Sequence, residues 1–211
     1  LLYEMPRSQV APDVISYTAS IGACEKAAKW QLAASLFEEL HARHLQPTVI
    51  SYSAIISACQ KAGQWQLALH FFSEMPRAEV SPNVISYNAT ITASERGGQW
   101  QLALFLFNSM PTARISPSIT SFNATLAACG KGEEWPLALH LFSTMAAARA
   151  SPNIMSYNAM LDSLGDHPIG RRVFQEAMDT GVYGRLCEES PLILESRLHA
   201  KGRDQRMSWE N

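Results

Sequence analysis

Cysteine is the residue type of this 211-residue chain best suited to metal binding or nucleophilic attack. Cys24, Cys59 and Cys129 lie 35 or 70 residues apart and share one position of a repeating pattern. Ligands one repeat apart would not converge on one ion, so we expect these cysteines to pack in the core as small hydrophobes. The sequence has no H-x-E or C-x-x-C motif, no P-loop, no G-x-S-x-G and no acidic cluster typical of a metallonuclease. It therefore predicts no catalytic residue, no metal site and no cofactor, and the chain is not expected to be an enzyme.

Cations recur with the same spacing and predict a different chemistry. Their positions are Lys26, Lys61, Arg96 and Lys131, one every 35 residues. One cation per repeat is what a ladder of phosphate contacts along a nucleic acid requires. The alternative is a favourable cation at the C-terminus of a helix, and the two roles are compatible.

Composition limits the remaining classes of function. Hydrophobic residues make up 47% of the chain and charged residues 17%, enough apolar surface for a folded core. The net charge of −2 excludes a polybasic clamp but not a local basic stripe. No run of 18 apolar residues occurs, so we expect no membrane partner. The chain begins with Leu1 rather than Met, so we expect a fragment of a longer protein, in which a missing targeting segment says nothing of the compartment.

An internal repeat of 35 residues determines the expected fold. The repeated residues are Trp30, Trp65, Trp100 and Trp135; Pro12, Pro47, Pro82, Pro117 and Pro152; and the aromatics Tyr17, Tyr52, Tyr87, Phe122 and Tyr157. Four complete units follow without an insertion, at 14–48, 49–83, 84–118 and 119–153. Residues 1–13 match the second half of a truncated earlier repeat, 154–188 form a degenerate fifth repeat, and 189–211 are expected to be a capping helix or a tail.

Each unit is predicted to contain two helices. Tyr17, Ile21 and Cys24 lie on one face of the first helix, and Ser16 is the expected N-cap. Short turns containing Gly63, Gly97–Gly98 and Gly132 lead to a second helix that starts near the tryptophan. The tryptophans are expected to pack between repeats rather than to stack on bases. Pro76 and Pro111 end the second helix in two units, and in the others it is expected to run a turn longer. One such unit cannot bury its apolar face alone, so the units are expected to stack into a solenoid with a concave groove.

The sequence resembles the pentatricopeptide repeat over residues 1–178. The resemblance rests on Pro-Asp-Val-Ile-Ser-Tyr-Thr at 12–18, Pro-Asn-Val-Ile-Ser-Tyr-Asn at 82–88, Ala-Cys-Gln-Lys-Ala-Gly at 58–63 and Phe-Phe-Ser-Glu-Met-Pro at 71–76. A period of 35 in every unit argues against the related tetratricopeptide repeat, which has 34 residues. The resemblance implies an all-α fold, a right-handed superhelical α-solenoid of stacked two-helix 35-residue repeats, about five of them in this fragment.

The resemblance also implies binding of single-stranded RNA, one base per repeat. In the family, the fifth and the last residue of each unit choose the base, and an aliphatic second residue wedges against it. Here the fifth residues are Thr18, Ser53, Asn88, Asn123 and Asn158; the last residues are Thr48, Asn83, Ser118 and Asn153; and the second residues are Ile15, Ile50, Ile85, Thr120 and Met155. Thr120 departs from the aliphatic pattern. The implied target is 5′-purine-A-C-(C/U)-(C/U)-3′.

Alternatives remain at the level of residues and of function. Short polar residues near a helix start are often caps, but Ser16 is expected to fill that role, which leaves Thr18 and its counterparts to contact bases. The implied role is RNA processing, stability or translation in a mitochondrion or chloroplast, with single-stranded RNA and other RNA-processing proteins as partners and no small-molecule substrate. The alternatives are a scaffold for protein–protein interaction, or the RNA-guiding arm of an enzyme whose catalytic domain is outside this chain.

Overall fold

The computed structural model describes residues 11–165 of the chain, and within this range all regular structure is helical. The helices are α1 (Val14–Lys26), α2 (Trp30–Ala42), α3 (Val49–Lys61), α4 (Trp65–Glu74), α5 (Val84–Arg96), α6 (Trp100–Ser109), α7 (Ile119–Lys131), α8 (Trp135–Ala147) and α9 (Ile154–Leu164). Residues 1–10 and 166–211 lie outside the described part, and with them most of the expected truncated repeat, the second half of the degenerate fifth repeat and the expected capping helix or tail. No helix within 11–165 is long and apolar enough to span a membrane.

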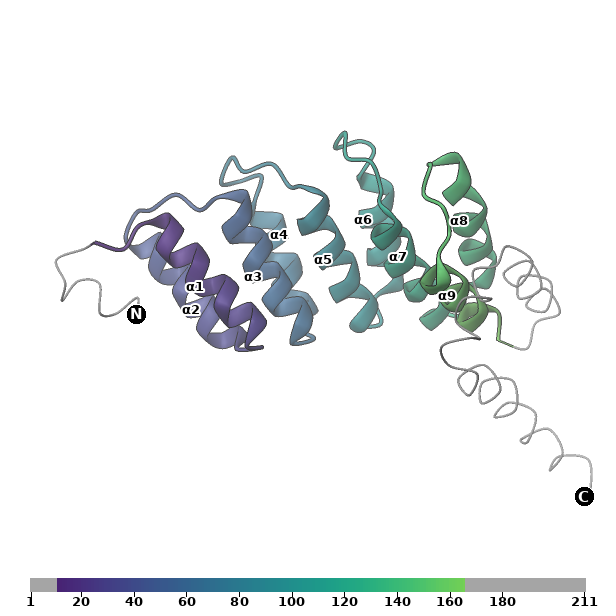
Figure 1. The fold of residues 1–211 in the computed structure, drawn as a ribbon, viewed down its shortest axis with the longest axis horizontal. Helices are drawn as coiled ribbons and strands as arrows, with labels where there is room; N and C mark the ends of the chain where they lie inside the picture. Colours follow the sequence, from purple (N-terminus) through teal and green to yellow (C-terminus); the bar gives the residue numbers. More distant parts are fainter. Residues whose placement is uncertain (1–10, 166–211) are drawn as a thin grey trace, which may run out of the picture.

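The helices form two layers that run side by side along the molecule, with the first helices of the units in one layer and the second helices in the other (Figure 1). The first helices of the units, α1, α3, α5, α7 and α9, each contact the next in order. The second helices α2, α4, α6 and α8 each pack against the first helix of their own unit and of the following unit. The predicted all-α solenoid of stacked two-helix units is therefore confirmed.

Each first helix begins at a polar residue that caps its free N–H groups, but that residue is not the serine predicted from the sequence. The N-caps are Asp13, Thr48, Asn83, Ser118 and Asn153, and each accepts a hydrogen bond from the N–H of the serine three residues later. In α3, α5, α7 and α9 that serine side chain also accepts from the N-cap N–H, which completes a capping box. The prediction of Ser16 as N-cap was wrong by three residues, because Asp13, the extended residue before the helix, supplies the capping oxygen.

Each turn between the two helices of a unit contains, at the same position, one residue whose positive φ places it in the left-handed region. Those residues are Ala28, Gly63, Gly98 and Glu133, with φ of 55°, 71°, 69° and 59°. Gly97 and Gly132 also lie in these turns, as predicted, with ordinary φ of −79° and −84°. They are needed for another reason: a Cβ at Gly97 would lie 2.3 Å from Trp65 Cδ1, and one at Gly132 would lie 2.4 Å from Trp100 Cδ1. Trp65 and Trp100 thus pack between repeats, as predicted for the tryptophans.

Proline controls the length of the second helices. The helices α4 and α6, which precede Pro76 and Pro111, have 10 residues each, whereas α2 and α8 have 13. Proline cannot donate the next helical hydrogen bond and its ring clashes with the preceding turn. The predicted difference of one turn is confirmed.

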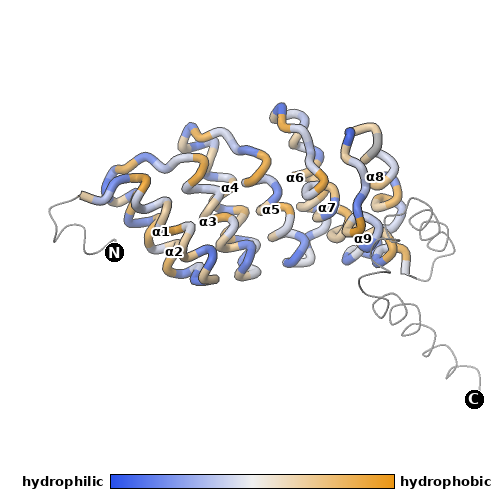
Figure 2. Tube along the Cα trace, viewed as in Figure 1, coloured by the Kyte–Doolittle hydropathy of each residue, from blue (hydrophilic) through white to orange (hydrophobic). Residues whose placement is uncertain are grey.

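The core runs between the layers and is joined at every repeat junction by a pair of aromatic rings. These pairs are Phe37–Tyr52, Phe72–Tyr87, Phe107–Phe122 and Phe142–Tyr157, all edge-to-face, with centroids 4.8–5.1 Å apart. Each joins the second helix of one unit to the first helix of the next. Edge-to-face aromatic pairs contribute about 0.5–1.5 kcal/mol beyond the area that they bury. Hydrophobic and hydrophilic positions are mixed within the helices of every unit, as expected for helices that bury one face (Figure 2).

Candidate functional site

One face of the first helices carries an exposed apolar side chain in the first turn of nearly every unit. These second residues are Ile15, Ile50, Ile85 and Met155, with 76%, 66%, 56% and 64% of their surface exposed. Thr120 takes the same exposed position in the fourth unit. Large aliphatic side chains held in water lose the free energy that burial would give, about 1.5–3 kcal/mol each. A repeated arrangement of this kind is typical of a surface that is covered by a ligand.

The fifth residues lie beside the second residues, because residues three apart on a helix are neighbours. At three junctions the structure brings the fifth residue together with the last residue of the same unit. Ser53 Oγ donates to Asn83 Oδ1 at 3.5 Å, Asn88 Nδ2 to Ser118 Oγ at 3.1 Å, and Asn123 Nδ2 to Asn153 Oδ1 at 3.2 Å. Thr18 instead contacts Ser51 Oγ at 2.7 Å, while Thr48 contacts the same oxygen at 3.1 Å. Asn158 lies on α9, and the end of its unit is outside the described residues.

These contacts correct the view that the fifth residues have no structural role. Besides its bond to Ser118, Asn88 accepts from Ser121 Oγ at 2.5 Å, and Asn123 accepts from Ser156 Oγ at 2.6 Å. The fifth residues therefore link the start of one first helix to the start of the next. Sequence reasoning missed this because the true N-caps were not recognised. The pattern of a Thr, Asn or Ser three residues before each serine would have indicated them.

Accessibility differs among the fifth residues. Thr18, Asn88, Asn123 and Asn158 are partly exposed, whereas only 7% of the surface of Ser53 is exposed. The last residues Asn83, Ser118 and Asn153 are partly exposed and Thr48 is exposed. The junctions that contain Asn88 and Asn123 consequently offer more polar surface to a ligand than the junction that contains Ser53.

The predicted phosphate-contacting cations lie at the other end of the first helices. The fifth residue and the cation of one unit are eight positions apart, about 12 Å along the helix axis. Lys61 Nζ pairs with Glu25 at 2.8 Å and Lys131 Nζ with Glu95 at 2.6 Å, each acid belonging to the preceding first helix. Arg96 donates to the Gln60 carbonyl oxygen at 3.2 Å. These side chains are exposed, as is Lys26 on α1. They link repeats and would have to exchange these partners to contact a phosphate.

The cysteine thiols of the described residues, which are the candidate nucleophiles and metal ligands of the sequence, lie in the core. Cys24, Cys59 and Cys129 are buried, and burial raises the pKa of Cys59 and Cys129 to about 11, which leaves little thiolate at neutral pH. Among the described residues no group of three His, Cys, Asp or Glu side chains is arranged to hold a metal ion.

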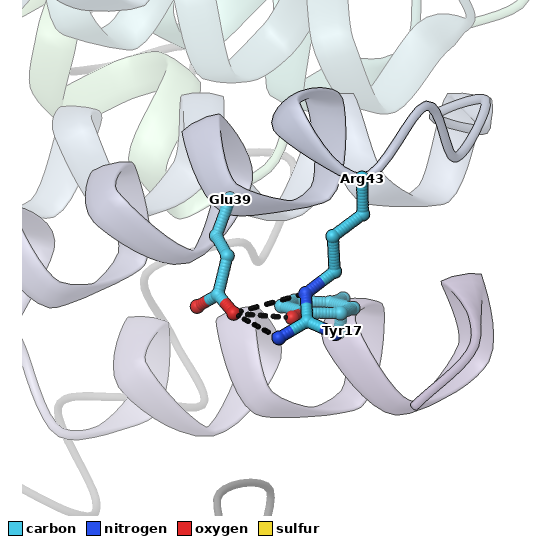
Figure 3. A network of polar contacts seen from close by, with 3 residues as sticks. All are labelled: Tyr17, Glu39 and Arg43. Atoms are coloured by element: carbon cyan, nitrogen blue, oxygen red, sulfur yellow. Dashed lines mark hydrogen bonds and ion pairs between the residues drawn. The ribbon is translucent and has the colours of Figure 1, made fainter. Parts of the chain in front are cut away.

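A polar network joins the two helices of the first complete unit (Figure 3). The buried Tyr17 donates its hydroxyl proton to Glu39 Oε1 at 2.7 Å, and Arg43 donates to the same oxygen through Nη2 at 2.8 Å. The Arg43 guanidinium also lies 5.8 Å from the centre of the Tyr17 ring. A buried phenol requires a hydrogen-bond partner, so this network stabilises the packing of α1 on α2.

The fold and the repeated surface define the class of protein, an α-solenoid of two-helix repeats. Each repeat presents an exposed side chain at its second residue, apolar in all but the fourth, beside a polar fifth residue on its first helix. Sequence comparison then gives the family. A profile described as "Pentatricopeptide repeat domain" matches residues 1–62, one described as "PPR repeat family" matches 47–95, and one described as "PPR repeat" matches 85–115. The chain belongs to the pentatricopeptide repeat family, as its sequence pattern predicted. No curated protein sequence matches the chain.

Several solved structures share the fold. The PPR domain of Arabidopsis thaliana protein-only RNase P 1, in complex with tRNA, matches with a TM-score of 0.69 and 16% identity over 77% of this chain and 87% of that one. PPR10 in complex with an 18-nucleotide psaJ RNA element matches with a TM-score of 0.71 and 19% identity over 81% of this chain. The nuclear proteinaceous RNase P 2 of A. thaliana matches with a TM-score of 0.67 and 13% identity over 77% of this chain. The matches cover only 26% of the PPR10 chain and 38% of the RNase P 2 chain.

Proposed function

We propose that the protein binds single-stranded RNA along the face of its first helices, with one base at each repeat. The observation that carries the proposal is the set of exposed aliphatic side chains beside polar pairs. Ile85, for example, is exposed next to Asn88, which in turn contacts Ser118. An apolar side chain can pack on the face of any base, and an adjacent amide or hydroxyl can bond to the base edge.

The solved relatives support this choice of ligand. The PPR domain of RNase P 1 and PPR10 were both solved in complex with RNA. The proposed order of bases follows the order of the polar pairs, Thr18 with Thr48, Ser53 with Asn83, Asn88 with Ser118 and Asn123 with Asn153, and gives 5′-purine-A-C-(C/U)-(C/U)-3′ when Asn158 is added. Contacts of Lys26, Lys61, Arg96 and Lys131 with phosphates are part of the proposal and would add a salt-dependent component to the affinity.

The proposed contribution of these repeats is binding rather than catalysis. Stacking of a base on a side chain contributes about 1–3 kcal/mol, and the ordering of a flexible strand subtracts from this gain. Five bases should therefore give weak binding by the described repeats alone. The proposed setting is RNA processing, stability or translation in a mitochondrion or chloroplast, with other RNA-processing proteins as further partners.

Fluorescence anisotropy with a labelled RNA 12-mer containing the proposed core tests this function. A scrambled RNA and the DNA of the same sequence serve as ligand controls. We expect preference for the proposed RNA, and we expect Asn88→Asp to weaken it about 3- to 10-fold. An aspartate at this position can still accept from Ser121, and the Ser118 hydroxyl can turn to donate to it, so the fold is kept, but it has no N–H to donate to a base.

Asn108→Asp is the matched control variant, because Asn108 is exposed on α6, a second helix, and the change adds the same charge. Equal weak binding to all three nucleic acids would leave only nonspecific phosphate contact. The absence of binding would favour the protein-interaction scaffold over the RNA-binding function.

A further inference from the structure

The hydroxyl of Ser121 lies between a group that can only donate a hydrogen bond and a group that accepts one. The main-chain N–H of Ser118 donates to Ser121 Oγ at 2.9 Å as part of the capping box of α7. A backbone N–H has no alternative to donation, so this oxygen must accept. Its own proton goes to Asn88 Oδ1, at 2.5 Å.

The next junction repeats the arrangement. The Asn153 N–H donates to Ser156 Oγ at 3.1 Å, and Ser156 Oγ donates to Asn123 Oδ1 at 2.6 Å. Ser121 and Ser156 are completely buried, so their hydroxyl groups do not exchange these partners for water. At both junctions the shortest contact of the serine hydroxyl is its bond to the asparagine oxygen, shorter than the 3.1 Å contacts with Ser118 Oγ and Asn153 Oδ1. Each serine therefore holds the oxygen end of the asparagine side chain.

This contact fixes which end of the asparagine amide faces which neighbour. In Asn88 the amide oxygen is held by Ser121, and one amide hydrogen goes to Ser118 Oγ at 3.1 Å. In Asn123 the oxygen is held by Ser156, and one amide hydrogen goes to Asn153 Oδ1 at 3.2 Å. The second amide hydrogen of each asparagine takes no part in these bonds. A ligand at this position therefore meets a fixed N–H donor.

We propose that Ser121 and Ser156 are positioning residues for base selection: each locks an asparagine amide so that it presents an N–H group to a base with a carbonyl acceptor, such as O2 of a pyrimidine. The inference rests on the proposed RNA-binding function and deepens it. It assigns part of the specificity of one repeat to the third residue of the next repeat, a residue that does not touch the base.

The second unit provides a natural contrast. Ser86 occupies the same capping position, is equally buried and accepts from the Asn83 N–H at 3.0 Å. Its proton goes to the main-chain oxygen of Asn83 at 2.9 Å and not to the fifth residue, because the short side chain of Ser53 reaches only Asn83 Oδ1, at 3.5 Å. Ser86→Ala would thus remove a capping serine without releasing the fifth residue.

The test compares Ser121→Ala and Ser156→Ala with Ser86→Ala in the full chain. Binding is measured by anisotropy with four RNAs that differ only at the base assigned to the affected fifth residue. We expect Ser121→Ala to reduce discrimination between pyrimidine and purine about 3- to 10-fold at the base assigned to Asn88, with the other bases unchanged. Ser156→Ala should have the same effect at the base assigned to Asn123, which provides a second test should one variant fold poorly. Ser86→Ala should leave discrimination at its own base unchanged.

Thermal unfolding of the three variants separates positioning from stability. All three lose one capping bond, so we expect similar decreases in Tm, whereas only two should lose base discrimination. Unchanged discrimination in folded Ser121→Ala and Ser156→Ala, or an equal loss in Ser86→Ala, would overturn the inference while leaving RNA binding intact. Loss of the proposed function itself would appear differently, as no RNA preference in the unmodified protein.

Discussion

At the scale of residues, the polar groups of the candidate site have two uses at once. Thr48, Asn83, Ser118 and Asn153 supply the capping oxygens of the first helices and also contact the fifth residues, directly or through Ser51. Asn and Ser are among the best N-caps and Thr is only somewhat weaker, while Ala costs about 1 kcal/mol. A change at one of these positions alters helix capping as well as any base preference. The restriction to Thr, Ser and Asn at the last residue follows from that double use.

The acids that pair with the cations limit phosphate contact, and this gives a prediction. Glu95 pairs with Lys131 at 2.6 Å, so Glu95→Gln should leave Lys131 with only its bond to the main-chain oxygen of residue 95 and make its charge available to a phosphate. We expect tighter RNA binding and a salt slope, measured as log K against log salt, that is steeper by about 0.7. Anisotropy titrations at several salt concentrations measure both quantities.

The exposed Glu38 on α2, a second helix, provides the control, because Glu38→Gln makes the same change of net charge. If the two variants bind and respond to salt alike, the cation at the end of α7 does not contact a phosphate.

The sequence allowed us to predict which residues make up the site, but not which contacts they form with one another. The period of 35 identified the second, fifth and last residues because each is a fixed place in a helix that repeats. It could not show that Ser121 of one unit reaches Asn88 of another, since that bond depends on how closely two first helices pack. Burial of Ser53 likewise follows from packing and not from its residue type.

At the scale of elements, the turns and the helix ends are determined by local chemistry. Proline sets the length of α4 and α6, and capping boxes start α3, α5, α7 and α9. Both devices can be recognised in a single sequence. Gly97 and Gly132 lie in the turns, as predicted, but the prediction did not show that Trp65 and Trp100 of the preceding repeat occupy the space where a larger side chain would lie. A contact between units leaves no local mark beyond the glycine itself.

The left-handed turn residue predicts a stabilising substitution. Glu133 has φ of 59°, a conformation that costs a residue with a Cβ about 1–2 kcal/mol. Part of the gain from glycine is lost because it makes the unfolded chain more flexible. We expect Glu133→Gly to raise the free energy of unfolding by about 0.5–1 kcal/mol, measured by urea denaturation.

The equivalent turn in the third unit supplies the reverse experiment. A Cβ at Gly98, where φ is 69°, would meet no atom within 4 Å, so Gly98→Ala tests the backbone conformation alone. It should lower the free energy of unfolding by about 1 kcal/mol. Opposite signs for the two variants are required, and a destabilised Glu133→Gly variant would contradict this explanation of the turn.

At the scale of the whole molecule, the chain is a series of nearly identical junctions. Each has an aromatic pair in the core, such as Phe107 with Phe122. At the junctions of Thr18, Asn88 and Asn123 the fifth residue also bonds to the third residue of the next unit, as Asn88 does to Ser121. The stability of such a stack is approximately the sum of its units and their interfaces. Ligand contacts made one per repeat should therefore add along the stack, and their order should follow the order of the chain.

Selection from a pool of random RNA tests the central claim, which is one base per repeat in chain order. The protein is incubated with the pool, and the bound RNA is recovered and sequenced. The account predicts enrichment of 5′-purine-A-C-(C/U)-(C/U)-3′, with the most strongly selected positions at the bases assigned to Asn88 and Asn123. Enrichment of an unrelated consensus, or recovery without any sequence preference, would contradict it.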